Sequence, residues 1–178
     1  MTQKKITITR DSVAIGDDVN APHSKIIEVN EAVDSQCGSI EAKYRIGKKA
    51  GQLNIWSEIE INGDQESIKN EAQYQNAISK VKACLPHAEG VFRKLGIKLN
   101  VALSRPGSSS PLAQKVTLVD KPDDSSGERS NSSVFFLQPD PIVAKYGGRH
   151  ELCEMITHEL GHHLGFADEY FEPGTCHT

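Results

Sequence analysis

The chain has 178 residues, of which 37% are apolar, and a formal net charge of −4 from 20 basic and 24 acidic side chains. This length predicts one domain, and a slightly acidic chain without a basic stripe argues against a nucleic-acid partner. No run of about 18 apolar residues occurs, so the sequence predicts no membrane span.

The first part of the chain, residues 1–50, is expected to form a β-rich N-terminal extension ahead of a domain over residues 51–178. Runs at Ile6–Thr9, Ile26–Val29 and Ile40–Ile46 favour strands. Residues 1–10 are charged and lack the apolar core of a secretory signal peptide. We therefore expect a protein that is cytoplasmic, exported by a route that needs no signal peptide, or represented in its mature form.

The next two elements are a strand and a long helix. Leu53–Ile61 alternates over nine residues, which predicts a strand with one buried face. That face is expected to carry five residues: Leu53, Ile55, Ser57, Ile59 and Ile61. Residues 67–95 predict a helix that ends at Gly96, with Pro86 causing a kink or a division into two helices.

Three further elements complete the domain. Ile97–Leu103 alternates and predicts a strand, and the loop at 104–133 contains a possible short strand at Val116–Val119. Ser133–Leu137 predicts the last strand, followed by a helix over Arg149–Leu164. The order predicts an α+β fold in which a mixed, twisted sheet packs with a long helix and a second helix.

The second helix contains the pattern H-E-x-x-H. His158 and His162 are four residues apart, so their imidazoles project from one helix face and can reach the same ion. A catalytic zinc ion takes three protein ligands and keeps one position for water, whose pKa it lowers. Glu159 is expected to be the general base that accepts the proton of this water.

The third metal ligand is predicted to be Asp168. Gly165 can adopt the positive φ that commonly ends a helix, and this turn would direct Asp168 back to the metal. Glu169 is the alternative ligand. A solvated carboxylate in the turn is the structural alternative for Asp168.

The run H-E-x-x-H-x-x-G-x-x-D resembles the zinc signature of metzincins, with aspartate as the third ligand as in the snapalysin type. Residues 165–170 are also similar to zincin-like metallopeptidase domains of bacterial toxins and effectors. The resemblance implies a zincin-like fold, Zn²⁺ as cofactor, and an endopeptidase that acts on a protein or peptide. The similarity to toxin and effector domains also implies a bacterial effector or toxin. Metzincins also carry a methionine turn, whereas the two methionines here, Met1 and Met155, both precede Asp168.

Other polar residues are assigned secondary roles. His163 is rotated away from the His158/His162 face, so we expect it to pack rather than bind metal. Glu154 could orient His158 or be an exposed carboxylate. Tyr170 is the predicted oxyanion donor, and packing is its alternative role. The other candidate donors are Tyr146, His150 and His177.

By the same resemblance, Ser133–Leu137 would line the substrate cleft, and the alternative is an ordinary buried strand. Two other functions stay open: a non-catalytic module that zinc stabilises, and a metal-dependent amidase acting on a non-protein amide.

The four cysteines are Cys37, Cys84, Cys153 and Cys176. They form no C-x-x-C pair, which makes a cysteine zinc site unlikely. One or two disulfides, or four thiols, are both compatible with the sequence.

Overall fold

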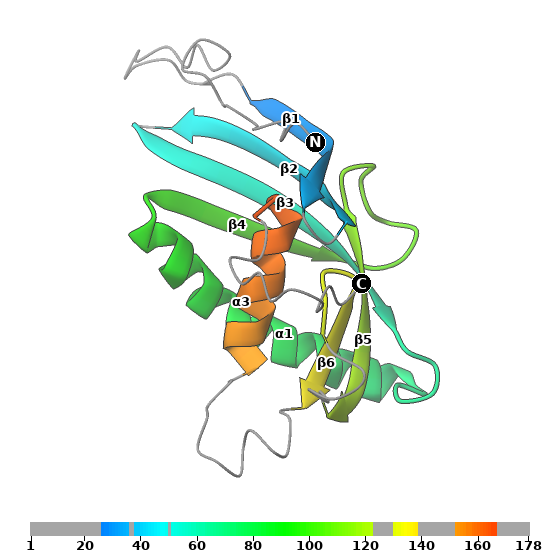
Figure 1. Ribbon diagram of the computed structural model, residues 1–178. Coiled ribbons are helices and arrows are strands. Elements are labelled where there is room, and N and C mark those ends of the chain that lie inside the picture. The colour runs from blue at the N-terminus through cyan, green and yellow to red at the C-terminus, as the bar shows by residue number, and fades with distance from the viewer. Residues whose placement is uncertain (1–25, 36–37, 50, 123–129, 139–151, 167–178) are drawn as a thin grey trace.

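The computed structural model describes residues 26–35, 38–49, 51–122, 130–138 and 152–166. Within these ranges the chain forms six strands and two helices, an α+β arrangement that confirms the predicted fold class (Figure 1). The predicted strand at Ile6–Thr9 lies outside the described residues. None of the helices in these ranges is long and apolar enough to cross a bilayer.

All six strands belong to one mixed sheet, with β3 at its centre. Their bounds are β1 Ile27–Ser35, β2 Gly38–Lys49, β3 Gln52–Gly63, β4 Ile97–Ser104, β5 Gln114–Pro122 and β6 Val134–Gln138. The order is β1-β2-β3-β5-β6, and β4 pairs with the other edge of β3. The pairings of β1 with β2 and of β2 with β3 are antiparallel, whereas β3 is parallel to both β4 and β5, and β5 to β6.

Along one edge of β3, the first part of the strand pairs with β2 and the last part pairs with β5. β2 pairs with β3 only as far as the Arg45–Trp56 pair, and β5 begins at the Ile59–Gln114 pair. β2 and β5 therefore diverge at this point. Gln114 bridges the divergence by donating from Nε2 to the Glu41 carbonyl oxygen at 2.5 Å.

The strand β3 confirms the alternation predicted for it and adds burial on its second face. Ile55, Ile59 and Ile61 are buried in the core, and Ser57 is buried beside them. Asn54 and Glu60 on the opposite face are also buried, which corrects the expectation of one buried side. The loop after β4 explains the difference, because its Ser109 hydroxyl and Ser110 N–H donate to the carboxylates of Glu60 and Glu58 on this face.

Helix α1 (Glu71–Lys94) begins at Asn70, whose Oδ1 accepts a hydrogen bond from the Gln73 backbone N–H at 3.0 Å. It ends before Gly96, which has a φ of 78°. Pro86 lies inside this single helix, so the predicted division into two helices is wrong. Pro86 is exposed, and the carbonyl of the turn before it can be hydrated.

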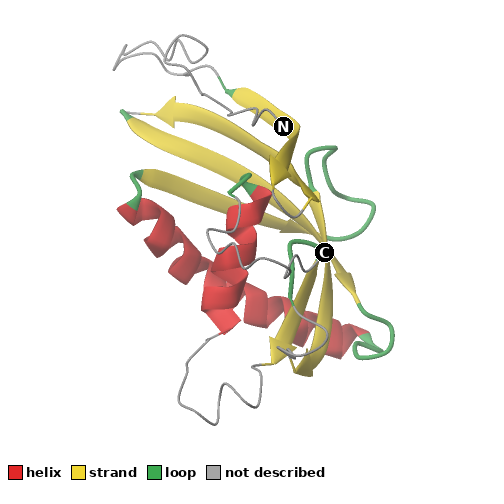
Figure 2. Ribbon diagram, in the orientation of Figure 1, coloured by secondary structure: helices red, strands yellow, loops and turns green. Residues whose placement is uncertain are grey.

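Helix α3 (Leu152–His163) carries the H-E-x-x-H motif and crosses α1 on the same side of the sheet (Figure 2). The two helices share one core with the strands. This core contains Ile156 and Leu160 of α3 and Leu164 directly after the helix, which join Val81 and Phe92 of α1. The face of α3 that carries His158 is therefore directed away from the core.

Candidate metal centre

The imidazoles of His158 and His162 converge on one point. Their Nε2 atoms lie 3.1 Å apart, with the rings nearly perpendicular at 87°. Two ligand atoms bound to a tetrahedral zinc at its usual distances would be about 3.3 Å apart. His158, Glu159 and His162 each offer a ligand atom, and these atoms lie within 4.8 Å of one another. The three residues, named here the His-Glu-His group, could hold a metal ion.

The tautomer of His162 follows from its second ring nitrogen. Nδ1 lies 2.7 Å from the Phe166 carbonyl oxygen, and a carbonyl can only accept, so Nδ1 carries the proton. In the neutral ring, Nε2 then presents its lone pair toward His158. Metal-binding histidines commonly use such a backbone carbonyl to fix ring orientation.

The turn at Gly165 produces this contact. Gly165 has a φ of 84°, its N–H donates to the His162 carbonyl at 2.8 Å, and the Phe166 N–H donates to the Gly161 carbonyl at 3.1 Å. These two bonds form a Schellman motif, which ends the helix and reverses the chain. The predicted helix end at Gly165 is confirmed.

Glu159 lies on the buried side of the group. Glu159 is 5% exposed, whereas His158 is exposed and His162 is half-buried. The low dielectric around a buried carboxylate strengthens its attraction for a nearby cation or proton. Glu159 is thus placed beside the imidazoles, as the spacing predicts.

His163 packs in the core, as expected, instead of joining the group. It is 1% exposed, its ring stacks near that of Phe135 with centroids 6.2 Å apart, and its Nε2 donates to the Ser132 carbonyl at 2.6 Å. Burial lowers its pKa to about 4, the hydrogen bond to Ser132 opposes this shift, and the nearby His162 adds to it. His163 is therefore a neutral residue that ties α3 to the segment before β6.

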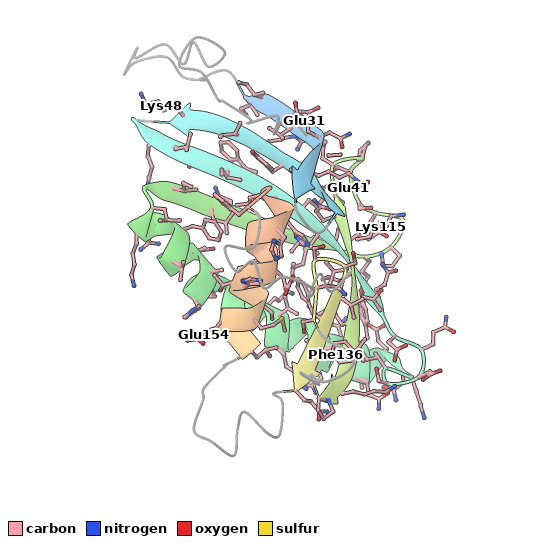
Figure 3. All side chains as sticks on the ribbon, in the orientation of Figure 1. Glu31, Glu41, Lys48, Lys115, Phe136 and Glu154 are labelled. Carbon is pink, nitrogen blue, oxygen red and sulfur yellow. A yellow bond between two sulfur atoms is a disulfide. The ribbon has the colours of Figure 1, made fainter. Side chains whose placement is uncertain are left out.

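The other predicted site residues divide into two sets. Glu154 is exposed on α3 and points away from the helix (Figure 3), so the structure favours the exposed-carboxylate alternative for it. The remaining candidates lie outside the described residues: Asp168, Glu169, Tyr170, Tyr146, His150 and His177. Phe166, which orients His162, carries no signal in the sequence, because the contact is made by its backbone.

A polar cavity of about 650 Å³ lies where β2 and β5 diverge. Its walls include Glu41 and Lys115, labelled in Figure 3, as well as Glu60 and Ser132. No member of the His-Glu-His group lines it. Of the residues that line it, Ser132 accepts a hydrogen bond from His163 on α3.

Ser133–Leu137 corresponds to β6, which ends the series of strands that begins at β1. Its backbone is partly satisfied locally. The Phe136 N–H donates to Ser130 Oγ at 3.0 Å, and the Val134 N–H donates to the Asn131 carbonyl at 3.1 Å.

Comparisons with protein-family models, with curated proteins and with solved structures found no match to this chain. The His-Glu-His group and the motif that forms it are therefore the features of the molecule that bear on its function.

Proposed function

We propose that the chain is a zinc-dependent endopeptidase of the zincin type, with His158 and His162 as metal ligands. The observation that carries the proposal is the 3.1 Å separation of their Nε2 atoms with the Glu159 carboxylate beside them. Two imidazoles and a carboxylate form a donor set that suits zinc.

Asp168 is the proposed third ligand. The Phe166 carbonyl already lies against the His162 ring, so the reversed chain is at the group two residues before Asp168. Two residues of chain span at most about 7 Å, a reach that is compatible with ligation by Asp168. This supports the glycine turn as the device that supplies the third ligand.

In the proposed reaction, Glu159 and the Phe166 carbonyl have different roles. When bound, zinc would polarise a peptide carbonyl and lower the pKa of a water molecule. A carboxylate oxygen of Glu159 would accept the water proton and then deliver it to the departing amine nitrogen. The Phe166 carbonyl holds the His162 proton on Nδ1, which keeps Nε2 available for the ion.

The test is an unbiased cleavage screen. The full chain, loaded with zinc, is incubated with a peptide library, and new termini are identified by mass spectrometry with and without chelator. Glu159→Gln should bind zinc and lose cleavage by about 100-fold or more, because general-base catalysis is worth at least that factor. Glu89→Gln on α1 is the matched control and should cleave normally.

Two results would reject the peptidase. One is equal product formation by wild type and Glu159→Gln. The other is zinc binding without any peptide product, which would favour a stabilising metal or a non-protein amide substrate.

A further inference from the structure

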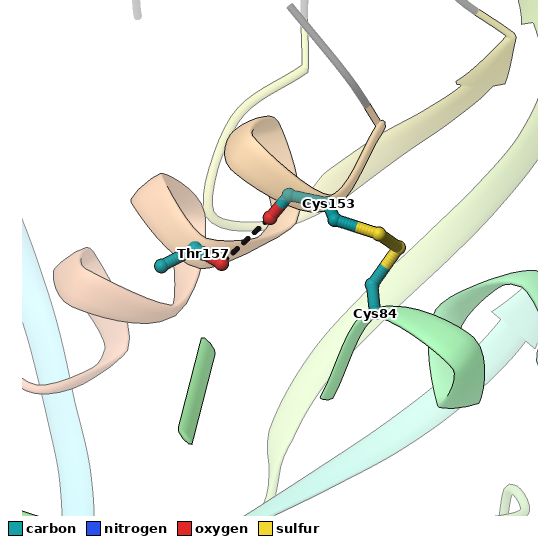
Figure 4. The surroundings of a disulfide bond; sticks show 3 residues. All are labelled: Cys84, Cys153 and Thr157. Carbon is teal, nitrogen blue, oxygen red and sulfur yellow. Dashed lines mark hydrogen bonds between the residues drawn. A yellow bond between two sulfur atoms is a disulfide. The ribbon is translucent and has the colours of Figure 1, made fainter. Parts of the chain in front are cut away.

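A disulfide joins the metal-binding helix to the rest of the domain. Cys84 of α1 is bonded to Cys153 in the first turn of α3 (Figure 4), across 69 positions of sequence and with a Cα–Cα distance of 4.6 Å. Cys153 precedes His158 by five residues, so the covalent link lies less than two turns from the first imidazole.

Among the described residues, helix α3 is held on the core by a short series of apolar side chains. It has 12 residues, a length at which isolated helices are marginal in water. Within it, Ile156 and Leu160 are buried, Leu152 and Met155 are partly buried against the core, and Leu164 follows at its end. The same face buries Glu159 and His163, whose desolvation opposes docking. The position of the helix therefore depends on its attachments.

The attachments found at the two ends of α3 differ in kind. At its C-terminal end, Phe166 contacts Phe92 with ring centroids 6.3 Å apart, and His163 binds Ser132. At its N-terminal end the disulfide makes the connection to α1. Thr157, next to His158, donates from Oγ1 to the Cys153 carbonyl at 2.6 Å, which links the bridged turn to the turn that carries the imidazole.

We propose that the Cys84–Cys153 disulfide is an oxidation-dependent latch that holds α3 in its metal-binding position. The inference rests on the metal site proposed above. It adds the condition under which that site assembles, namely an environment in which this disulfide persists.

The latch closes by thiol–disulfide exchange with a small disulfide such as oxidised glutathione. The thiolate of one cysteine attacks a glutathione sulfur and releases one reduced glutathione. The second cysteine thiolate then attacks the mixed disulfide and releases another. Two thiols lose two protons and two electrons, and oxidised glutathione accepts both electrons. Cytosolic thiol pools favour the reverse reaction, whereas extracellular and periplasmic environments favour the bond.

The test uses the full chain with Cys37→Ala and Cys176→Ala, which leaves one cysteine pair. Its zinc affinity is measured by chelator competition, using oxidised protein and protein reduced by a phosphine that does not bind zinc strongly. Hydrogen exchange of the α3 amides is followed in the same two states without metal. The control adds Cys84→Ala and Cys153→Ala to the same protein. Its zinc affinity and hydrogen exchange should not change with reductant.

Reduction should weaken zinc binding about tenfold or more, as expected if about one tenth of the molecules keep α3 docked. Exchange should accelerate at residues 152–163, while the amides of β3 stay protected. Unchanged affinity and exchange would overturn the latch. Loss of protection throughout β3 would overturn it too, because the bond would then hold the whole fold. If the oxidised protein binds no zinc, the proposed function fails, and the α3 exchange still decides the latch.

Discussion

The His162 Nδ1 atom lies 2.7 Å from the Phe166 carbonyl oxygen, across the turn that ends α3. The contact joins two features, because the turn that stops the helix also fixes the tautomer of a proposed metal ligand. Gly165 makes it possible through a φ of 84°, a conformation that other residues adopt with strain. The helix end and the metal centre should therefore respond together to substitution.

Substitution of a proposed ligand should remove the metal. His162→Ala is expected to lower zinc affinity by more than about 100-fold, since residues that merely orient ligands already cost 10–100-fold. His87→Ala is the control, because His87 is exposed on α1 and away from the motif. Competition with a zinc-sensitive dye measures both variants, and equal affinities would exclude His162 as a ligand.

Two glycine substitutions should change stability in opposite directions. Gly165→Ala places a Cβ at a positive φ and should lower the free energy of unfolding by about 1 kcal/mol. Gly90→Ala lies within α1, where an added Cβ meets no atom within 4 Å, and should raise it by about 0.5–1 kcal/mol. Urea denaturation measures both values. The Gly165 variant should also bind zinc more weakly than wild type. Normal zinc binding would show that the turn is not needed for the metal site.

Acid should destabilise the metal-free protein through His163. Burial lowers the pKa of His163 to about 4, whereas the unfolded chain has the ordinary value near 6.5. The unfolded state binds the proton more tightly than the folded state does. The contribution of His163 to the free energy of unfolding is therefore complete above pH 6.5 and decreases as the pH falls toward 4. The total decrease is about 3 kcal/mol.

Urea denaturation in chelator at several pH values between 4 and 7 tests this linkage. His163→Gln removes the titrating group and keeps an amide donor at the position of Nε2 for the Ser132 carbonyl, so the stability of this variant should vary less over this range. A slope identical to that of wild type would assign the acid sensitivity to other groups.

The sequence predicts the parts of this fold that depend on local pattern. The alternation in β3, the end of α1 before Gly96 and the glycine turn of α3 are confirmed, since each depends on neighbouring residues, whereas α1 begins at Glu71 and not at residue 67. The sequence predicts an apolar stripe in α1, and it is only partly confirmed; its members are Ala72, Ile78, Val81, Leu85, Val91, Phe92 and Leu95. Ala72 and Leu95 are exposed, and the contact is made instead by smaller buried residues, including Ala77, Cys84 and Ala88. Cys84 is bonded to Cys153 of α3, and a search for large apolar residues misses such a small residue at a helix contact.

Pairing between distant residues could not be predicted. Four cysteines allow three full pairings, so the Cys84–Cys153 bond could not be chosen from spacing. β1 and β2 join the same sheet as β3, although residues 1–50 read as an extension. Val116–Val119, a possible short strand in the sequence, lies within β5, which pairs with both β3 and β6. These outcomes depend on tertiary contacts that no local pattern records.

In the candidate site, too, the local spacing could be predicted and the contacts that depend on the fold could not. The H-E-x-x-H spacing places three groups on one helix, and the structure brings their ligand atoms within 4.8 Å. The roles of Asp168 and Tyr170 remain predictions, because both lie outside the described residues. The Phe166 carbonyl could not be anticipated, since it depends on the angle of the turn rather than on residue type.

X-ray absorption at the zinc edge of the loaded full chain tests the central claim most directly. The His-Glu-His geometry predicts two imidazole nitrogens at about 2.0–2.1 Å, with the remaining ligands being oxygen. A spectrum dominated by sulfur at about 2.3 Å would place the metal on cysteines, and a spectrum without imidazole scattering would contradict the assignment of His158 and His162.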